Sequence, residues 1–297
     1  MTQKITKAVI PAAGFGTRFL PWTKASPKVL LPVVDRPIVQ IVVEELVEAG
    51  IKEIVFVINE YTQAVKNYFS PFPELEEKLR LGGKEKELAE INRLNQLAKF
   101  HYVSQLLLGK GGTGVAILSA EKFIGQEPFL VLWADDFIVA QPSRTKQLLQ
   151  AFEKYQGTIF SCFKKTDPEA GKKYGFAAGR EIEEGVLKVS GLVEKPGFGK
   201  QPSPYAIVSG FVFLPSIFGN LKKAVKKFAH QREIFYNVDG VLPSLGKESA
   251  YALEIKNGQY YDTGNKLEYL KTVVDFGLKH PELGESFKEY LKGLKLV

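Results

Sequence analysis

Apolar runs of strand length alternate with stretches of helical periodicity through the first half of the chain. A run over residues 7–12 leads into a glycine-rich turn. Apolar residues then recur at helical spacing over residues 38–50, where Gly50 predicts the end of a helix. Further strand-like runs cover residues 53–58, 129–133 and 158–163. This alternation predicts an α/β fold with a mostly parallel mixed sheet flanked by helices.

The pattern changes twice along the chain. Residues 73–99 are rich in Glu, Leu and Lys, with opposite charges at helical spacing, which predicts an inserted pair of helices broken at Gly82 and Gly83. Beyond about residue 174 the apolar runs become shorter and are separated by turn residues. They cover residues 186–194, 206–214 and 249–255, before a helix over 266–278 and a helical tail. Because no repeat or low-complexity linker separates these parts, residues 1–297 are expected to form one domain.

The composition favours a soluble globular protein of the cytoplasm. Of the 297 residues, 45% are hydrophobic and 25% are charged, which is the usual balance for a globular domain with a substantial core. Cys162 is the single cysteine, so no internal disulfide can form, and this fits a reducing compartment. The first residues do not have the apolar run of a signal peptide, and no run approaches the roughly 20 apolar residues of a membrane span.

The net charge of +7 leaves three interpretations open. Nucleic-acid binding is the least favoured, because the chain has no stripe of basic and aromatic residues. A solvated lysine-rich surface is the simplest interpretation, since Lys222, Lys223, Lys226 and Lys227 have the spacing of one outer helix face. Attraction of a small polyanion, such as a nucleoside triphosphate, is the third. We expect no nucleic-acid partner and no membrane partner.

Residues 8–18 combine a strand, small residues, two glycines and a cation. Small residues let backbone N–H groups approach a phosphate closely, and Arg18 can add a bidentate contact. Lys28 supplies a second cation, and two fixed cations suit a triphosphate. Two glycines alone would indicate only a turn. The segment is not a Rossmann fingerprint, because Phe19 takes the place of the third glycine, and no Gly-Lys pair is followed by the Ser or Thr of a P-loop.

A longer set of motifs around this segment resembles a known protein family. The chain resembles the sugar-1-phosphate nucleotidyltransferase family in residues 14–18, Pro21, the Pro27-Lys28 pair and residues 31–37. The resemblance implies that Arg18 and Lys28 are catalytic. It also implies a nucleotide held by Ala12, Ala13, Gly14, Gly16 and Thr17.

The same resemblance implies the family's Rossmann-like nucleotidyltransferase fold with a sheet-rich sugar-binding extension. The expected parts are a nucleotide-binding half over about residues 5–173, a sugar-phosphate-binding half over about 174–265 and C-terminal helices over 266–297. We expect a homo-oligomer, either a dimer or a tetramer.

The middle of the chain resembles the uridylyl branch of the family. The insertion at residues 74–88 is similar to a helical segment of the uridylyl enzymes that the thymidylyl enzymes usually lack. The resemblance places Gln105 against the uracil edge, for which an amide is suited because it both donates and accepts. It places Gly112 in the glycine turn that lines the base site, although Val115 replaces a polar residue there. A dTTP-dependent glucose-1-phosphate thymidylyltransferase stays open as an alternative.

Residues 129–136 form an apolar run that ends in two carboxylates. Ligands commonly lie at strand ends in open α/β sheets, and Mg²⁺ prefers one or two carboxylates with phosphate oxygens and water. The resemblance implies that Asp135 is a catalytic metal ligand and that Asp262 is the second ligand. Asp136 is expected to bind the nucleotide or to brace Asp135. An isolated Asp-Asp pair would otherwise indicate a turn or a helix cap.

Two further motifs resemble the sugar-phosphate site of the family. There, the backbone of Gly175 and the carboxylate of Glu194 would hold glucose hydroxyls, and Lys195 would neutralise the phosphate as a further catalytic cation. Without the resemblance, Glu194 and Lys195 would read as a surface charge pair. Residues 232–237 match their family segment only weakly, so the sugar is less well specified than the reaction type.

Together these resemblances imply Mg²⁺-assisted transfer of a uridylyl group from UTP to glucose 1-phosphate, giving UDP-glucose and pyrophosphate. The attack on the α-phosphorus would be in line. A weakly active regulatory homologue stays open as a further alternative, because Trp133 and Ala134 replace the family's usual Leu-Gly.

Overall fold

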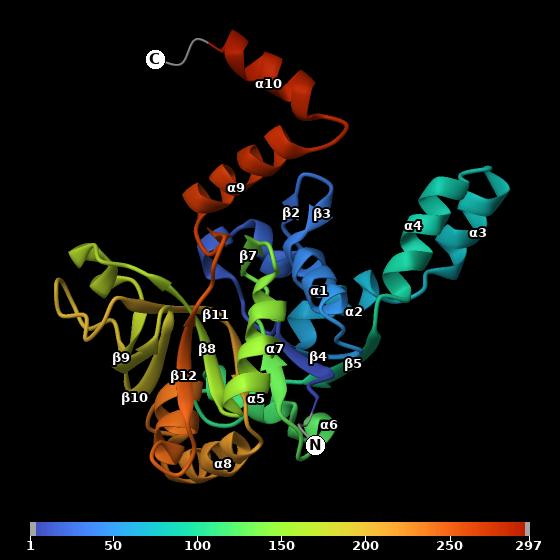
Figure 1. The fold of residues 1–297 in the computed structure, drawn as a ribbon. Coiled ribbons are helices and arrows are strands. Elements are labelled where there is room, and N and C mark those ends of the chain that lie inside the picture. Colours follow the sequence, from blue (N-terminus) through green and yellow to red (C-terminus); the bar gives the residue numbers. More distant parts are fainter. Residues whose placement is uncertain (1–3, 295–297) are drawn as a thin grey trace.

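A nine-stranded mixed sheet crosses the molecule in the computed structural model, which describes residues 4–294 (Figure 1). The strand order is β5-β4-β1-β6-β11-β8-β12-β10-β9, with an additional pairing of β9 to β11. The strands are β1 (Lys7–Pro11), β4 (Glu53–Ile58), β5 (Lys99–Ser104), β6 (Phe129–Val131), β8 (Thr158–Lys164), β9 (Gly175–Glu183), β10 (Val186–Glu194), β11 (Tyr205–Phe213) and β12 (Ala250–Glu254).

Parallel pairing dominates the first half of the sheet, and antiparallel pairing the second. β4 is parallel to both β1 and β5, and β1 is parallel to β6. Apart from the parallel pair of β8 and β12, the remaining neighbours are antiparallel. The α/β prediction with a mixed sheet is therefore confirmed. The division at residues 173 and 265 stays a prediction, because one continuous sheet spans these parts.

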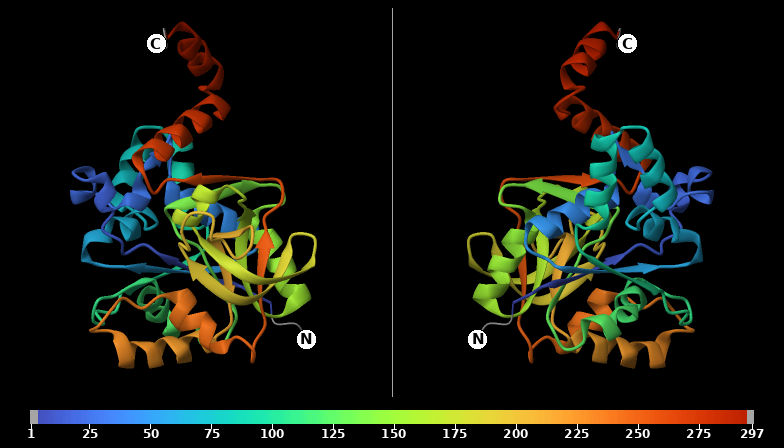
Figure 2. Two further views of the ribbon diagram at one scale, coloured as in Figure 1. Left: turned by 90° about the vertical axis from the view of Figure 1, so that its left-hand side faces the viewer. Right: turned by 90° about the vertical axis from the view of Figure 1, so that its right-hand side faces the viewer.

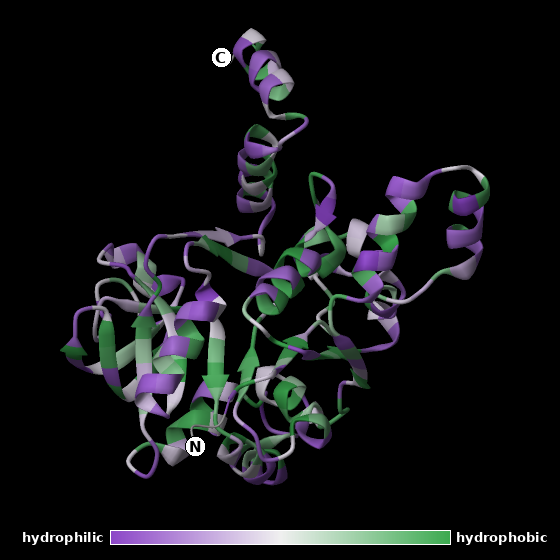
Figure 3. Ribbon diagram, turned by 45° about the vertical axis from the view of Figure 1, so that its right-hand side comes forward, coloured by the Kyte–Doolittle hydropathy of each residue, from purple (hydrophilic) through white to green (hydrophobic). Residues whose placement is uncertain are grey.

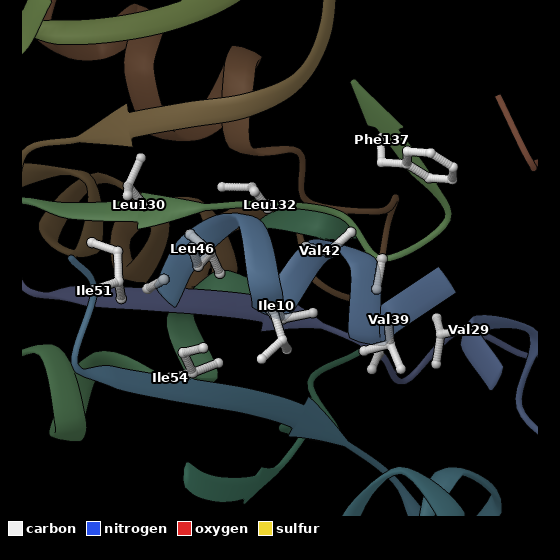
Figure 4. Close-up of a cluster of buried hydrophobic side chains, with 14 of the residues drawn as sticks. Ile10, Val29, Val39, Val42, Leu46, Ile51, Ile54, Leu130, Leu132 and Phe137 are labelled. Atoms are coloured by element: carbon white, nitrogen blue, oxygen red, sulfur yellow. The ribbon is translucent and has the colours of Figure 1, made fainter. Parts of the chain in front are cut away.

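Helices cover both faces of the sheet. Their bounds are α1 (Ile38–Glu48), α2 (Ala64–Tyr68), α5 (Thr113–Ser119), α6 (Glu121–Ile124), α7 (Arg144–Tyr155) and α8 (Ser216–Phe228). Because side chains alternate along a strand, Ile10 packs with α1 and α7 on one face, whereas Val9 packs with α5 and α8 on the other. Figure 4 shows Val42 and Leu46 of α1 lying over Ile10 and Leu130. Burial of each such aliphatic side chain stabilises the fold by about 1.5–3 kcal/mol.

Two helical pairs project from this body. The predicted insertion is present as α3 (Pro73–Leu81) and α4 (Glu85–Asn95), an arm that is mainly hydrophilic in Figure 3. Arg93 of α4 joins it to Glu44 of α1, with 2.8 Å between Nη2 and Oε1. The predicted C-terminal helices are α9 (Lys266–Lys279) and α10 (Gly284–Gly293), which rise above the sheet in Figures 1 and 2. Within residues 4–294, none of the helices has the length and apolarity needed to cross a membrane.

One predicted strand end is wrong. The strand predicted over residues 129–133 ends at Val131, because Val131 is the last residue of β6 to pair with β11. Asp135 therefore lies in a connection, and Asp136 begins a strand that was not predicted, β7 (Asp136–Ala140). β7 pairs antiparallel with β13 (Gly258–Asp262), and Asp136 lies opposite Asp262. A further two-stranded sheet joins β2 (Pro32–Val33) to β3 (Arg36–Pro37) ahead of α1.

Candidate active site

A cavity of about 660 Å³ opens at the carboxyl ends of β1 and β6. Its lining comes from segments far apart in the sequence, including the loop after β1, the end of β5, the start of α5 and the connection after β6. Ten of the residues predicted from the sequence line it: Ala12, Ala13, Gly14, Gly16, Thr17, Arg18, Lys28, Gln105, Gly112 and Asp135. The structure thus brings the predicted nucleotide-binding residues together in one place, with Asp136 as the exception.

The loop after β1 is held in position by neighbouring backbone and side chains. The Ala12 amide donates to the Val57 carbonyl at 2.8 Å, and the Asn59 side-chain amide donates to the Ala13 carbonyl at 2.7 Å. The Thr23 hydroxyl donates to the Gly16 carbonyl at 3.0 Å. With these carbonyls engaged, the small residues of the loop form one wall of the cavity, where backbone N–H groups can approach an anion.

The glycine turn before α5 forms another part of the wall. Gly112 has φ of 109°, and a β-carbon there would lie 2.4 Å from the Ile234 carbonyl oxygen, so only glycine fits. Ile234 exchanges backbone hydrogen bonds with this turn, donating to the Gly111 carbonyl and accepting from the Gly114 amide, both at 2.9 Å. Gln105 follows the end of β5, and its backbone amide donates to the Ile58 carbonyl at 2.8 Å.

The charged groups meet around Asp135. Lys28 Nζ lies 2.9 Å from Asp135 Oδ2, and the Lys28 side chain is almost fully buried whereas the carboxylate is about half exposed. Arg18 Nη1 donates to the Gly264 carbonyl at 3.2 Å, and the Gly264 amide donates to Asp262 Oδ1 at 2.7 Å. The Thr263 hydroxyl donates to the Asp135 carbonyl at 2.6 Å. These contacts gather the predicted cations Arg18 and Lys28 with both predicted metal ligands.

The two carboxylates fit a hard divalent cation. Asp135 faces the cavity, and Asp262 has one carboxylate oxygen engaged by a backbone amide, which leaves the other oxygen for a ligand. Within the part of the chain that the structure describes, no group of three or more His, Cys, Asp or Glu side chains is arranged to hold a metal. A site with two carboxylates therefore suits a cation that completes its shell with phosphate oxygens and water.

Asp136 does not line the cavity. Its side chain points into the protein, where Oδ2 accepts from the Tyr260 hydroxyl at 2.9 Å and Oδ1 has no hydrogen-bond partner. Burial, and secondly the neighbouring Asp135, raises the pKa of Asp136 to about 7. The geometry does not favour direct nucleotide binding by Asp136 and agrees with the other expectation, a brace behind Asp135.

The predicted sugar-phosphate residues form a second group, outside the lining of the cavity. Gly175 and Glu194 lie opposite each other in the β9–β10 pair, and the Lys195 amide donates to the Tyr174 carbonyl at 3.2 Å. Lys195 Nζ is 3.9 Å from Glu194 Oε1, and both side chains are exposed. None of the three predicted residues lines the cavity, so the structure separates them from the nucleotide wall.

The charges of the predicted site residues influence two tyrosines. Burial, and after it the charge of Asp262, raises the pKa of Tyr174. Burial, and after it the charge of Glu194, raises the pKa of Tyr236, and Asp136 adds to the effect. Charges from both groups thus act on Tyr236, whereas Tyr174 is joined to the second group by the hydrogen bond from the Lys195 amide to its carbonyl.

Several cavity residues were not predicted. Gly264 ends the motif that contains Asp262, but only Asp262 was given a role in that motif. Glu233 and Phe235 lie in the segment whose family match is weak. Trp133 also lines the cavity, with its ring centroid 5.8 Å from that of Tyr236. The sequence alone marks Trp133 only as a departure from the family's usual leucine.

Comparisons with known proteins agree with this geometry. Residues 7–276 match the Nucleotidyl transferase family. The UTP–glucose-1-phosphate uridylyltransferase of Bacillus subtilis (strain 168) is 36% identical over 292 residues, which cover 98% of this chain and 98% of that protein. The UTP-bound UGPase from Acinetobacter baumannii has a TM-score of 0.86 at 32% identity, covering 98% of this chain and 100% of that one. A UDP-glucose pyrophosphorylase complexed with UDP-glucose has a TM-score of 0.80 at 33% identity, covering 93% and 100%. With a family match over most of its length and full-length relatives, the chain belongs to the nucleotidyl transferase family.

Proposed function

We propose that this chain is a UTP–glucose-1-phosphate uridylyltransferase, which transfers a uridylyl group from UTP to glucose 1-phosphate and releases pyrophosphate. The observation that carries the proposal is the meeting of Arg18, Lys28 and Asp135 on the wall of one cavity, with Asp262 joined to that wall through the Gly264 amide. The name of the similar Bacillus subtilis enzyme, and the UTP and UDP-glucose bound in the similar structures, support the choice of substrates.

The chemistry needs alignment more than it needs a base. A phosphate oxygen of glucose 1-phosphate is already an anion, so it can attack the α-phosphorus of UTP without losing a proton. The new P–O bond forms as the bond to pyrophosphate breaks, and pyrophosphate leaves with the electron pair. The protein must hold two anions together and offset their repulsion, which is the usual task in phosphoryl-type transfer.

Each charged group has a place in this scheme. Arg18 and Lys28 lie on the wall that would hold the triphosphate, where their charge offsets the charge that develops on the leaving pyrophosphate. Lys195, beside Glu194 and Gly175, would take the phosphate of the sugar. Gln105 and the Gly112 turn would hold the base.

A divalent metal completes the proposed site. Members of this family generally use a divalent metal ion, and we propose Mg²⁺ held by Asp135 and Asp262. When bound, the ion would neutralise phosphate charge and fix the phosphate oxygens. Lys28 Nζ forms an ion pair with Asp135 Oδ2, so the lysine also holds that carboxylate at the cavity wall.

Pyrophosphate release tests the proposal. The protein is incubated with UTP or dTTP, each paired with glucose 1-phosphate or galactose 1-phosphate, with and without Mg²⁺. We expect the fastest release from UTP with glucose 1-phosphate and a loss of release when EDTA removes the metal. Faster release with dTTP would favour the thymidylyl alternative, and no release with any pair would favour a regulatory homologue. A homo-oligomer and a cytoplasmic location stay predictions that size-exclusion chromatography and cell fractionation can check.

A further inference from the structure

A largely buried ion pair lies behind the proposed site and belongs to none of its predicted parts. Arg144, at the start of α7, has no exposed side-chain surface, and its partner Glu45 of α1 is 9% exposed. Arg144 Nη2 and Nε donate to the two Glu45 oxygens at 2.6 and 3.2 Å. Desolvation largely cancels the attraction within such a pair, so stability alone is a weak account of its role.

The third nitrogen of the Arg144 guanidinium contacts an irregularity in β11. Nη1 donates to the Ser209 carbonyl at 2.9 Å, and the Ser161 hydroxyl donates to the same oxygen at 2.6 Å. Ile207 lies opposite Cys162 and Phe211 lies opposite Phe160, so three residues of β11 stand against Ser161 alone. This is a β-bulge, and such bulges bend a strand and redirect its side chains.

Gly210 allows Arg144 to fill the bulge. Gly210 has φ of 115°, and a β-carbon there would lie 2.7 Å from Arg144 Cδ. The arginine side chain therefore packs against bare backbone, and its planar fork joins α1 and α7 to the bend in β11.

β11 connects the two substrate sides across this bend. Before the bulge, Ile207 pairs with Gly175 of the proposed sugar-phosphate group. After it, Phe211 pairs with Val131 of β6. Within it, the Ser209 hydroxyl accepts from the Trp133 amide at 2.9 Å, two residues before Asp135. The angle at the bulge thus sets where Gly175 and its neighbours lie relative to Asp135.

We infer that Arg144, Glu45 and Ser209 form a positioning network that fixes the sugar-phosphate side against the catalytic carboxylate. This inference rests on the proposed function. None of the three side chains lines the nucleotide wall, and the network touches a residue of that wall only where the Ser209 hydroxyl accepts from the Trp133 backbone amide. The network therefore acts mainly on the geometry between the two reactants.

Two variants loosen the network without leaving a buried charge unpaired. Arg144→Lys keeps a cation beside Glu45 but cannot reach Glu45 and Ser209 together as the fork does. Ser209→Ala keeps the carbonyl that Arg144 contacts and removes the acceptor of the Trp133 amide. Thr145→Val is the matched control, because Thr145 donates to the same Glu45 oxygen at 2.8 Å and does not contact the bulge.

The readout separates positioning from folding. Pyrophosphate release at saturating UTP gives kcat/KM for glucose 1-phosphate, and calorimetric titration with UTP alone gives the Kd of the nucleotide. We expect kcat/KM for glucose 1-phosphate to fall by about 10- to 100-fold in Arg144→Lys and Ser209→Ala, with the UTP Kd changed by about twofold or less. Thr145→Val should lower the melting temperature and leave both constants near those of the wild type.

The opposite result is equally clear. If the two variants only melt at lower temperature, as the control does, and keep the wild-type kcat/KM, the network is merely structural and the inference is overturned. A wild-type protein that forms no UDP-glucose overturns the proposed function, and the inference with it, before any variant is compared.

Discussion

Lys28 shows how one side chain can serve two functions in the candidate site. Its ammonium lies 2.9 Å from Asp135 and 5.8 Å from the centroid of the Phe19 ring, and its side chain is 10% exposed. A buried ammonium beside a carboxylate is held in a fixed position, so it can meet the triphosphate without reorganisation. A half-exposed Asp135 stays solvated if the lysine is lost, which makes Lys28 a position where activity and folding can be separated.

Replacement of Lys28 by methionine should therefore remove activity and leave the fold. The variant keeps the aliphatic length of the side chain but loses the charge facing the phosphates. We expect kcat to fall by about 100- to 1,000-fold, as for the loss of one transition-state donor, with an unchanged circular dichroism spectrum. Lys24→Met is the control, because Lys24 lies on the same loop, is exposed and does not line the cavity. A Lys28→Met enzyme with kcat near that of the wild type would refute the assignment.

The proposed role of Gly112 in UTP binding rests on its backbone geometry and not on a charge. Gly112→Ala should weaken UTP binding by about tenfold or more, because the new β-carbon would lie 2.4 Å from the Ile234 carbonyl oxygen and would push the glycine turn from the wall. Gly125→Ala separates collision from backbone strain, since Gly125 has φ of 70° but no atom within 4 Å of its β-carbon position. Calorimetric titration with UTP measures the difference, and equal UTP affinity in the two variants would contradict the account.

At the level of elements, the sequence pattern predicted the regular helices and strands better than the segments that connect them. The strands before and after α1, the inserted pair α3 and α4 and the final helices follow from apolar periodicity and turn residues. The β7–β13 ribbon did not, because Asp136 looked like the second of two carboxylates at the end of one strand. Its strand character appears only when Gly258–Asp262 pairs with it.

The residues of the candidate site divide in the same way. The cavity residues near β1 sit in a local motif, so the sequence could predict them. Arg144 could not be predicted, since an arginine directly after the N-cap Ser143 usually lies in solvent, and only the bulge in β11 makes it an interior residue. Whether Gly175, Glu194 and Lys195 meet the nucleotide depends on tertiary arrangement that local pattern does not contain.

The π-helical segment Tyr236–Val241 supports the glycine turn through Asp239. Asp239 accepts from Arg232 at 2.6 and 2.8 Å and from the Phe235 amide at 2.8 Å. Burial alone would raise the pKa of Asp239, but the hydrogen bonds from Arg232 and Phe235 outweigh it and lower the pKa below its ordinary value. The pair therefore stabilises the folded state above about pH 4, and this contribution is lost as the pH falls through the lowered pKa.

Asp239→Asn should accordingly lower the free energy of unfolding near neutral pH. It should also reduce the dependence of that free energy on pH in the acid range. We expect the free energy of unfolding at pH 7 to fall by about 1–2 kcal/mol, a modest value because the Arg232 side chain is 39% exposed. The difference from the wild type should shrink below about pH 4. Urea titrations at several pH values measure it, with Glu184→Gln as the control, because Glu184 is 90% exposed. A difference that is constant from pH 7 to pH 3 would contradict the linkage.

At the scale of the whole molecule, one continuous sheet carries both groups of proposed site residues. The parallel strands end at the wall that would hold the triphosphate, and the antiparallel strands β9 and β10 carry the residues proposed for the sugar phosphate. β11 pairs with strands of both parts. The function proposed for this architecture is a direct reaction of the two bound anions, without a nucleotide attached to the protein at any stage.

The configuration at the α-phosphorus tests this claim most directly. The enzyme is supplied with one diastereomer of UTP carrying sulfur on the α-phosphorus, together with glucose 1-phosphate, and the configuration of the UDP-glucose product is determined by ³¹P NMR. A single in-line attack by the bound sugar phosphate predicts inversion at phosphorus. Retention would show two successive displacements through a uridylyl-protein intermediate and would contradict the account.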